Sequence, residues 1–205
     1  MRRVLVLFAH PVFERSRVNR RMLDAVRDLE GVTVRDLYVD YPTMRIDVKR
    51  EQAILAEHDV IVFQHPFYWY STPALLKEWQ DLVLEHGWAY GDGGTQLRGK
   101  ITLNAVTTGG PAAAYRHDGY NRYTVKELLA PYDQTAYLCG MRYLAPFAIH
   151  AALQVVGDAD VAVARAKYRQ LLEALRDERL DLDRAERVEN LCAELDDVMR
   201  AREVA

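Results

Sequence analysis

Short apolar runs alternate along this chain with segments whose apolar residues recur at helical spacing. Val4 to Ala9 forms one such run, and Val60 to Phe63 forms another. Uninterrupted apolar runs of this length are typical of parallel strands that are buried on both faces. Between the two runs, Val18, Met22 and Val26 follow each other every four residues, which indicates an amphipathic helix. The alternation predicts an α/β protein whose parallel sheet lies between two layers of helices.

The pattern locates five strands and the helices between them. The strands are expected at residues 4–9, 32–38, 60–63, 101–106 and about 141–150. The helices are expected at residues 18–29, 48–57, 73–83, 124–137 and 161–175. Five strands with intervening helices make a three-layer sandwich.

The last segment, residues 178–205, is highly charged but keeps an apolar periodicity. Val188, Leu191, Leu195 and Val198 follow at spacings of three, four and three residues. This spacing predicts a C-terminal amphipathic helix that packs on its own protein, and a helix that docks on a partner subunit is the alternative. Because no repeat, linker or low-complexity stretch interrupts the chain, residues 1–205 are expected to form one domain.

Composition and charge exclude several classes of protein. Half of the 205 residues are apolar and 28% are charged, as in globular proteins. The net charge of −3 gives no basic surface for nucleic acid. Cys139 and Cys192 lack metal-ligand spacing and fit a reducing compartment. The run at residues 4–9 is too short for a signal peptide, and no stretch suits a membrane span. A cytoplasmic protein is therefore expected.

Ligands of open parallel sheets bind at the carboxyl ends of the strands, which directs attention to the segment after the first strand. Ser16 is expected to cap the following helix there. The N-terminus of a helix binds anions, so a phosphate monoester suits this place. Ser16 can donate a hydroxyl, Asn19 an amide, and His10 or Arg17 a charged or hydrogen-bonding edge. A capped helix with a solvated Arg17 is the alternative interpretation.

The segment after the third strand holds four consecutive aromatic residues, Phe67, Tyr68, Trp69 and Tyr70, between Pro66 and Ser71. Successive side chains point in different directions, so they cannot all belong to the core. Aromatic residues at this edge are suited to the wall of a flat heterocycle site. An aromatic plug under a loop, or a dimer contact, is the alternative.

The segment after the fourth strand reads Thr107-Thr108-Gly109-Gly110, with Tyr115 five residues further on. Paired glycines let the backbone approach a ligand closely, and their N–H groups can donate to an electron-rich ring edge. A Gly-Gly turn is common by itself, and its value here comes from its register with the other two segments.

Together, the motifs His10…Ser16-x-x-Asn19, Pro66-Phe-Tyr-Trp-Tyr70 and Thr107-Thr-Gly-Gly110 resemble the NAD(P)H:quinone oxidoreductase family of flavodoxin-like proteins. The likeness is greatest to the ancillary flavoproteins of bacterial glutathione-regulated potassium-efflux systems. The residues that carry this second likeness are Gln64-His-Pro66, Trp69-Tyr-Ser71, His86-Gly-Trp-Ala-Tyr-Gly91 and Leu144-x-Pro-Phe-Ala148. The resemblance covers about residues 2–175.

This resemblance implies a flavodoxin-like sheet of order 2-1-3-4-5 and a homodimer with one flavin per site at the subunit interface. FMN is the expected flavin, with FAD as the alternative. The flavin phosphate would be held by Ser16, Val18 and Asn19, with His10 close by. Pro66–Tyr70 would line the ribityl chain and ring, and Thr107–Gly110 would contact the pyrimidine edge of the ring.

The resemblance also implies an activity. NAD(P)H would reduce the flavin and a quinone would oxidise it in a ping-pong reaction. Tyr115 matches the substrate-side tyrosine of the family, and Asn121 stands where the family has a histidine. His117 is near but out of register as a catalytic partner of Tyr115. A regulatory subunit that contacts the cytosolic part of a membrane potassium antiporter, and a one-electron carrier, are the alternatives.

Overall fold

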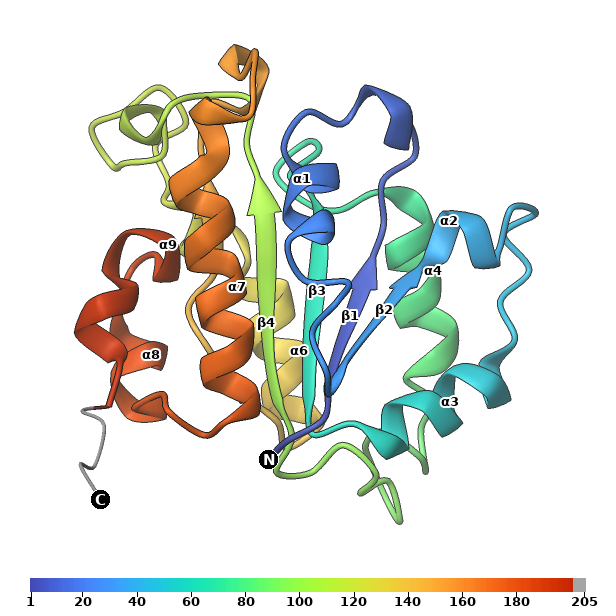
Figure 1. The fold of residues 1–205 in the computed structure, drawn as a ribbon. Coiled ribbons are helices and arrows are strands. Elements are labelled where there is room, and N and C mark those ends of the chain that lie inside the picture. Colours follow the sequence, from blue (N-terminus) through green and yellow to red (C-terminus); the bar gives the residue numbers. More distant parts are fainter. Residues whose placement is uncertain (201–205) are drawn as a thin grey trace.

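The computed structural model describes residues 1–200 and contains one parallel sheet (Figure 1). The strands lie in the order β2-β1-β3-β4-β5, and β6 also pairs with β4. The predicted order 2-1-3-4-5 is therefore confirmed. The strand bounds are Val4–Phe8 (β1), Val32–Asp36 (β2), Val60–Pro66 (β3), Ile101–Thr107 (β4), Arg142–Tyr143 (β5) and Phe147–Ile149 (β6).

The fifth position of the sheet is occupied by two short strands rather than by the one predicted at about 141–150. Both β5 and β6 pair with β4, and Leu144 to Pro146 separates them. Pro146 has no N–H to donate to a ladder. The backbone between the strands bonds instead to the C-terminal segment, because Ala145 N donates to Ala185 O and Pro146 O accepts from Leu191 N, both at 2.9 Å.

The side chains of each central strand alternate between two apolar cores, one on each face of the sheet. Val4, Val6 and Phe8 face the core that contains α1 and α7, whereas Leu5 and Leu7 face the core that contains α3, α4 and α6. Figure 1 shows these helices covering the two faces. Their bounds are Asn19–Asp24 (α1), Val48–Glu57 (α3), Ala74–Val83 (α4), Ala130–Leu138 (α6) and Ala162–Arg176 (α7).

Several helices and one strand are shorter than predicted, and for two of these elements the sequence explains why. The segment predicted at 124–137 forms α5 (Val125–Leu128) and α6, which are separated at Leu129 because Pro131 lies in the first turn of α6. The strand predicted at 32–38 ends at Asp36, whose carboxylate accepts from two amides of α2 (Leu37–Asp40). The helix predicted at 18–29 ends at Asp24 and continues as turns.

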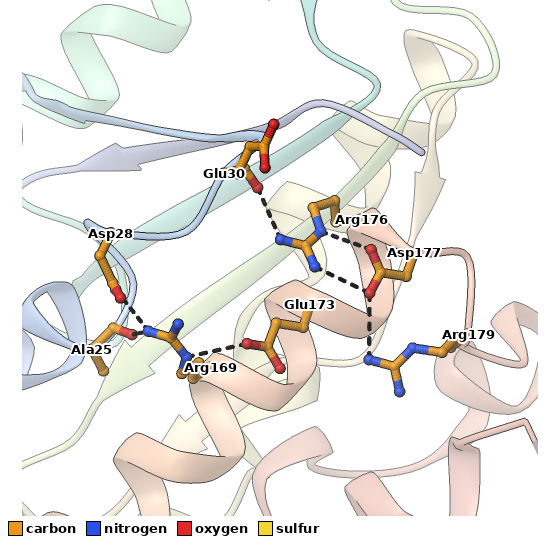
Figure 2. A network of polar contacts seen from close by, with 8 residues as sticks. All are labelled: Ala25, Asp28, Glu30, Arg169, Glu173, Arg176, Asp177 and Arg179. Atoms are coloured by element: carbon orange, nitrogen blue, oxygen red, sulfur yellow. Dashed lines mark hydrogen bonds and ion pairs between the residues drawn. The ribbon is translucent and has the colours of Figure 1, made fainter. Parts of the chain in front are cut away.

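Two arginines of α7 fix the turns that follow α1. Nη1 of Arg169 donates to the carbonyl of Ala25 and to Asp28, both at 2.7 Å, and Arg176 donates to the carbonyl of Glu30 at 2.9 Å (Figure 2). These guanidinium groups supply hydrogen bonds to carbonyls that no regular helix satisfies. The connection from α1 to the amino end of β2 is thereby attached to α7.

The C-terminal segment packs on its own protein, but the prediction of one helix there was wrong. It contains α8 (Leu182–Arg187), α9 (Leu191–Glu194) and a 3-10 turn (Leu195–Val198). Asn190 has an extended backbone and caps α9 with its side chain, which ends the helical path between α8 and α9. Leu191, Leu195 and Val198 are fully buried in the core beside α7. Residues 201–205 of the predicted helix lie outside the described residues.

Across residues 1–200, none of the helices combines the length and the apolar character that crossing a bilayer requires.

Candidate functional site

A cavity of about 730 Å³ lies at the carboxyl ends of β1, β3 and β4. Small-molecule sites usually span about 300–1,000 Å³. The structure brings residues of all three predicted segments into its wall: His10, Ser16, Arg17, Val18, Asn19, Pro66, Phe67, Tyr68, Trp69, Thr107, Thr108 and Gly109. The wall also contains four residues that the sequence did not indicate: Val12, Arg15, Ala152 and Leu153.

The loop before α1 presents unpaired donors to this cavity. The backbone amides of Arg17, Val18 and Asn19 have no acceptor among residues 1–200. The Ser16 hydroxyl oxygen accepts from the amide of Arg20 at 3.2 Å, so its own proton stays available. Val18, and not Ser16, occupies the capping position of α1, which has only six residues. An anion here would therefore be held by loop amides more than by a helix dipole.

Two arginines next to this loop differ in their contacts. Arg17 Nη1 donates to the carbonyls of Leu153 and Val155 at 3.0 and 3.2 Å, which ties the loop to the segment after β6. Arg15 lines the cavity and its guanidinium has no acidic partner in the described part of the chain. Arg15 is thus the cation most available to a negatively charged ligand.

A buried chain of side-chain hydrogen bonds joins the first and third loops beneath the cavity. The Asn19 amide donates to the Thr107 hydroxyl at 2.7 Å. The side-chain amide of Gln64 in β3 donates to the backbone carbonyl of Asn19 at 3.1 Å, and the side-chain oxygen of Gln64 accepts from the hydroxyl of Tyr168 in α7 at 3.0 Å. All four side chains are almost fully buried. The chain fixes Asn19 against the carboxyl end of β4, and one of its amide protons is already used.

His10 is a neutral hydrogen-bonding group in this structure. Its Nδ1 accepts from the Val12 amide at 3.2 Å, so Nε2 carries the proton. Burial lowers the pKa of His10, and the nearby Glu14 carboxylate offsets part of this effect. The ring lies edge-on to Tyr68 at 6.2 Å between centroids. His10 therefore connects the first loop to the aromatic segment.

The aromatic segment forms a tight turn with two left-handed residues. Trp69 and Tyr70 have φ values of 49° and 62°, and the Ser71 amide donates to the Tyr68 carbonyl at 2.9 Å. Positive φ at both central residues defines a type I′ turn, which costs free energy for residues other than glycine. Trp69 is 92% exposed although it borders the cavity. Strained, exposed aromatics at a cavity rim are typical of a ligand wall.

The third loop is fixed by the backbone of the segment that follows β6. Thr108 N donates to Ile149 O, and Thr108 O accepts from Ala152 N, both at 2.9 Å. A Cβ atom on Gly109 would lie 3.2 Å from Leu153 Cδ1, so the close approach favours glycine. The sequence signal for Ala152 and Leu153 was the carboxyl end of the fifth strand, to which the same rule on ligand sites applies.

Four residues expected at the site lie outside the cavity wall: Tyr70, Gly110, Tyr115 and His117. Tyr70 donates to the side chain of Asn121 at 3.1 Å. The expected partnership of His117 with Tyr115 is not seen, because the His117 imidazole bonds to Glu127 at 2.8 Å and is exposed. This carboxylate raises the pKa of His117.

Tyr115 has different neighbours from those expected. Its ring lies 6.2 Å from Phe67 and 5.5 Å from His150, measured between centroids. Burial raises the pKa of Tyr115, and the Thr108 hydroxyl offsets part of this rise. His150 was not indicated by the sequence motifs, because it lies beyond β6 and far from Tyr115 along the chain.

The chemistry of the cavity fits FMN. The loop before α1 lines it with unpaired amides, the Ser16 hydroxyl and Arg15, which suit a phosphate monoester. The loop after β3 lines it with Tyr68 and Trp69, whose apolar faces suit a planar ring. Gly109 lines it with backbone alone.

Comparison with known proteins gives the family. The family model described as the flavodoxin-like fold matches residues 2–172. The chain belongs to the flavodoxin-like fold family. This flavodoxin-like chain is also 50% identical over 150 residues to the glutathione-regulated potassium-efflux system ancillary protein KefG of Enterobacter sp. (strain 638), which covers 73% of this chain and 82% of the relative.

Solved structures resemble the flavodoxin-like chain over most of its length. General stress protein 14 of Treponema denticola, solved in complex with FMN, is 41% identical with a TM-score of 0.78, over 84% of this chain and 99% of that one. An NADPH-quinone reductase of P. pentosaceus is 31% identical with a TM-score of 0.74, over 82% of this chain and 96% of that one. The resemblance stated from the sequence motifs is confirmed.

Proposed function

We propose that this protein is a flavin-dependent NAD(P)H:quinone oxidoreductase that binds FMN in the cavity at the carboxyl edge of its sheet. One observation carries the proposal: three loops far apart in the sequence line one cavity, one of them with unpaired amides and another with aromatic side chains. Two relatives support it, since one of them was solved with FMN and another is named as an NADPH-quinone reductase.

FMN, when bound, would supply the redox chemistry, the transfer of a hydride from NAD(P)H to a quinone. The residues of this chain would bind the flavin and orient it. The amides of Arg17 to Asn19, the Ser16 hydroxyl and Arg15 hold the phosphate. Tyr68 and Trp69 would exclude water from one face of the ring, and the backbone of Gly109, which lines the cavity, would donate to its electron-rich edge. Gly110 follows just outside the wall. Tyr115, whose ring lies beside Phe67, would hydrogen-bond the acceptor oxygen.

The first experiment separates the two half-reactions. Protein loaded with FMN is reduced without oxygen by NADH or NADPH, and then mixed with benzoquinone in a stopped-flow instrument. The proposal expects rapid bleaching of the flavin absorbance by one of the nucleotides and rapid recovery with the quinone. Initial rates in the steady state should give the parallel lines of a ping-pong reaction. Flavin that neither nucleotide reduces would contradict the proposed activity and leave a one-electron carrier.

The subunit arrangement belongs to the same proposal. A homodimer in the cytoplasm would place Trp69, which is 92% exposed, against the second copy. Light scattering on a size-exclusion column should give twice the mass of the chain. A monomeric mass at micromolar concentration would contradict this part of the proposal.

A second role is favoured by the identity of about half the matched residues with KefG, which is named as an ancillary protein of a potassium-efflux system. In this role the protein contacts the cytosolic part of a membrane potassium antiporter. Co-purification of this protein with an antiporter encoded beside it, from detergent extracts, tests the contact. The variant Trp69→Ala, which lacks the exposed indole of the aromatic turn, serves as a comparison. If it still contacts the transporter but no longer binds FMN, the two roles are separate.

A further inference from the structure

We propose that His150, acting through the Thr108 hydroxyl, supplies the proton that Tyr115 gives to the acceptor. This inference rests on the proposed function and deepens it, since it names the group that completes the reduction. No sequence motif pointed to His150, and the histidine expected beside Tyr115, His117, is bonded to Glu127 instead.

Thr108 and His150 directly follow the carboxyl ends of β4 and β6, and the ring of Tyr115 packs beside His150, so the three groups form a cluster. His150 Nδ1 lies 3.0 Å from the Thr108 hydroxyl oxygen. That hydroxyl is close enough to Tyr115 to lower its pKa against the larger effect of burial. The rings of Tyr115 and His150 lie 5.5 Å apart between centroids. Thr108 is fully buried and lines the cavity, whereas His150 is only half-buried. The cluster therefore leads from a solvent-accessible imidazole to the cavity.

The hydrogen bonds of Thr108 define the tautomer of His150. The Thr108 hydroxyl has one proton, which it donates to the carbonyl of Gly110 at 2.8 Å. The bond between Thr108 and His150 therefore needs the proton of the imidazole, so Nδ1 is the donor and Nε2 has the lone pair. Burial alone lowers the pKa of His150, with no contribution from a charged group in the described residues. Tyr115 is the titratable side chain against its ring. The imidazole is neutral near pH 7 as a result.

A neutral imidazole of this tautomer can pass a proton on. The acceptor gains a hydride, and its oxygen becomes negative and takes the phenolic proton of Tyr115. Tyr115 recovers a proton from the Thr108 hydroxyl, which rotates away from Gly110, and Thr108 recovers one from His150 Nδ1. His150 Nε2 takes a proton from water at the same time. The acceptor gains one hydride and one proton, water supplies that proton and becomes hydroxide, and His150 is left neutral with its proton on Nε2. Proton exchange with solvent returns His150 to its resting tautomer.

The test compares His150→Gln with His86→Gln, in which the replaced histidine is exposed and follows α4. Glutamine can keep a donor toward Thr108 but cannot exchange a proton between two ring nitrogens. We expect reduction of FMN by NAD(P)H to change less than twofold in His150→Gln, and oxidation by benzoquinone to slow at least tenfold, within the range of general acid catalysis. Free imidazole should restore part of the lost rate. His86→Gln should match the wild type in both half-reactions.

A second measurement does not depend on turnover. The ¹⁵N spectrum of histidine-labelled protein, assigned with His150→Gln, should show His150 with its proton on Nδ1. Thr108→Val should remove that preference. Each of these two measurements decides the matter by itself. A wild-type His150 protonated on Nε2, or an unchanged oxidation rate in His150→Gln, would overturn the inference and leave the proposed function intact. A wild-type protein whose flavin is not reduced would remove the proposed function and this inference together.

Discussion

The side-chain amide of Asn19 donates to the hydroxyl of Thr107 at 2.7 Å, which joins the loop after β1 to the carboxyl end of β4. Gln64 in β3 donates to the backbone carbonyl of the same residue at 3.1 Å. Asn19 is buried and lines the cavity, and it thereby links the loop after β1 to both β3 and β4. Asn19 thus positions the loop proposed to bind the phosphate, and only part of its hydrogen-bonding capacity is left for that group.

Removing this amide should affect stability and binding together. Asn19→Ala leaves the Thr107 hydroxyl without its donor, whereas the Gln64 amide keeps the backbone carbonyl of residue 19 as its acceptor. A buried unpaired polar group costs about 1–3 kcal/mol. We expect the free energy of unfolding to fall by about 2 kcal/mol and the affinity for FMN to fall at least tenfold. Urea denaturation and flavin fluorescence titration measure the two effects. Because Thr107→Val removes the same bond, the double variant should show a coupling energy of about 0.5–3 kcal/mol; strict additivity would contradict the link.

The left-handed turn gives a prediction in which stability and binding separate. Trp69 has a φ of 49° and is 92% exposed, so its side chain contributes little packing in the free protein. Both Trp69→Gly and Trp69→Ala remove the proposed wall and should weaken FMN binding by similar factors. Glycine tolerates this backbone, so Trp69→Gly should unfold at a free energy about 1 kcal/mol higher than Trp69→Ala. Equal stabilities would show that the backbone at this position is unstrained.

His65 should make the stability of the protein depend on pH. It is fully buried, with Nδ1 bonded to the Pro66 carbonyl at 3.0 Å and Nε2 to Asn104 at 3.0 Å. Burial lowers the pKa of His65 to about 4, from 6.5. Between these values the unfolded chain binds a proton that the folded protein excludes. The stability is therefore complete above pH 6.5 and falls by about 3 kcal/mol as the pH drops to 4.

The measurement is the free energy of unfolding between pH 7.5 and pH 4, for the wild type and for His65→Gln. Glutamine cannot titrate, so the free energy of unfolding of His65→Gln should change less steeply with pH over this interval. The difference in slope should correspond to about one bound proton, whatever the stability of the variant at pH 7. Parallel curves for the two proteins would show that His65 is protonated in the folded state.

Asn190 in the C-terminal segment should stabilise the exposed edge of the sheet. Its side chain donates to the Ala148 carbonyl at 3.0 Å and accepts from the Ala148 amide at 2.9 Å, as a neighbouring strand would. Asn190→Ala should lower the free energy of unfolding by about 2 kcal/mol and accelerate hydrogen exchange at Ala148. Asn190→Asp keeps only the acceptor, so its free energy of unfolding and its exchange rate at Ala148 should lie between those of the wild type and Asn190→Ala. Unchanged exchange at Ala148 in Asn190→Ala would contradict this role.

Much of the fold could be predicted from the sequence because its strands are continuous apolar runs. Such runs require burial on both faces, and this makes a parallel sheet with two helical layers the natural solution. The three loops could be found for the same reason, since ligand sites of these sheets lie at the carboxyl ends of strands. The structure brings segments such as 66–69 and 107–109 into one cavity wall, and the binding of a ligand there stays a prediction.

Other features depend on three-dimensional contacts that periodicity does not contain. The apolar spacing identified Leu191 and Leu195 as buried, but the break at Asn190 comes from its bonds to Ala148 in another element. Likewise, the sequence distance between Tyr115 and His117 suggested a pair, whereas β6 brings His150 to Tyr115 and Glu127 holds His117 away. Side-chain direction in a loop is decided by such partners.

The central claim is that the loops after β1, β3 and β4 bind FMN in one cavity. The most direct measurement is the absorption spectrum of the purified protein before and after it is offered FMN, with the released flavin identified by mass. Our account predicts absorption bands of a bound flavin that is released as FMN, with one FMN bound per chain at saturation. Asn19→Ala should bind less FMN at the same FMN concentration. Protein that is colourless and takes up neither FMN nor FAD would contradict it.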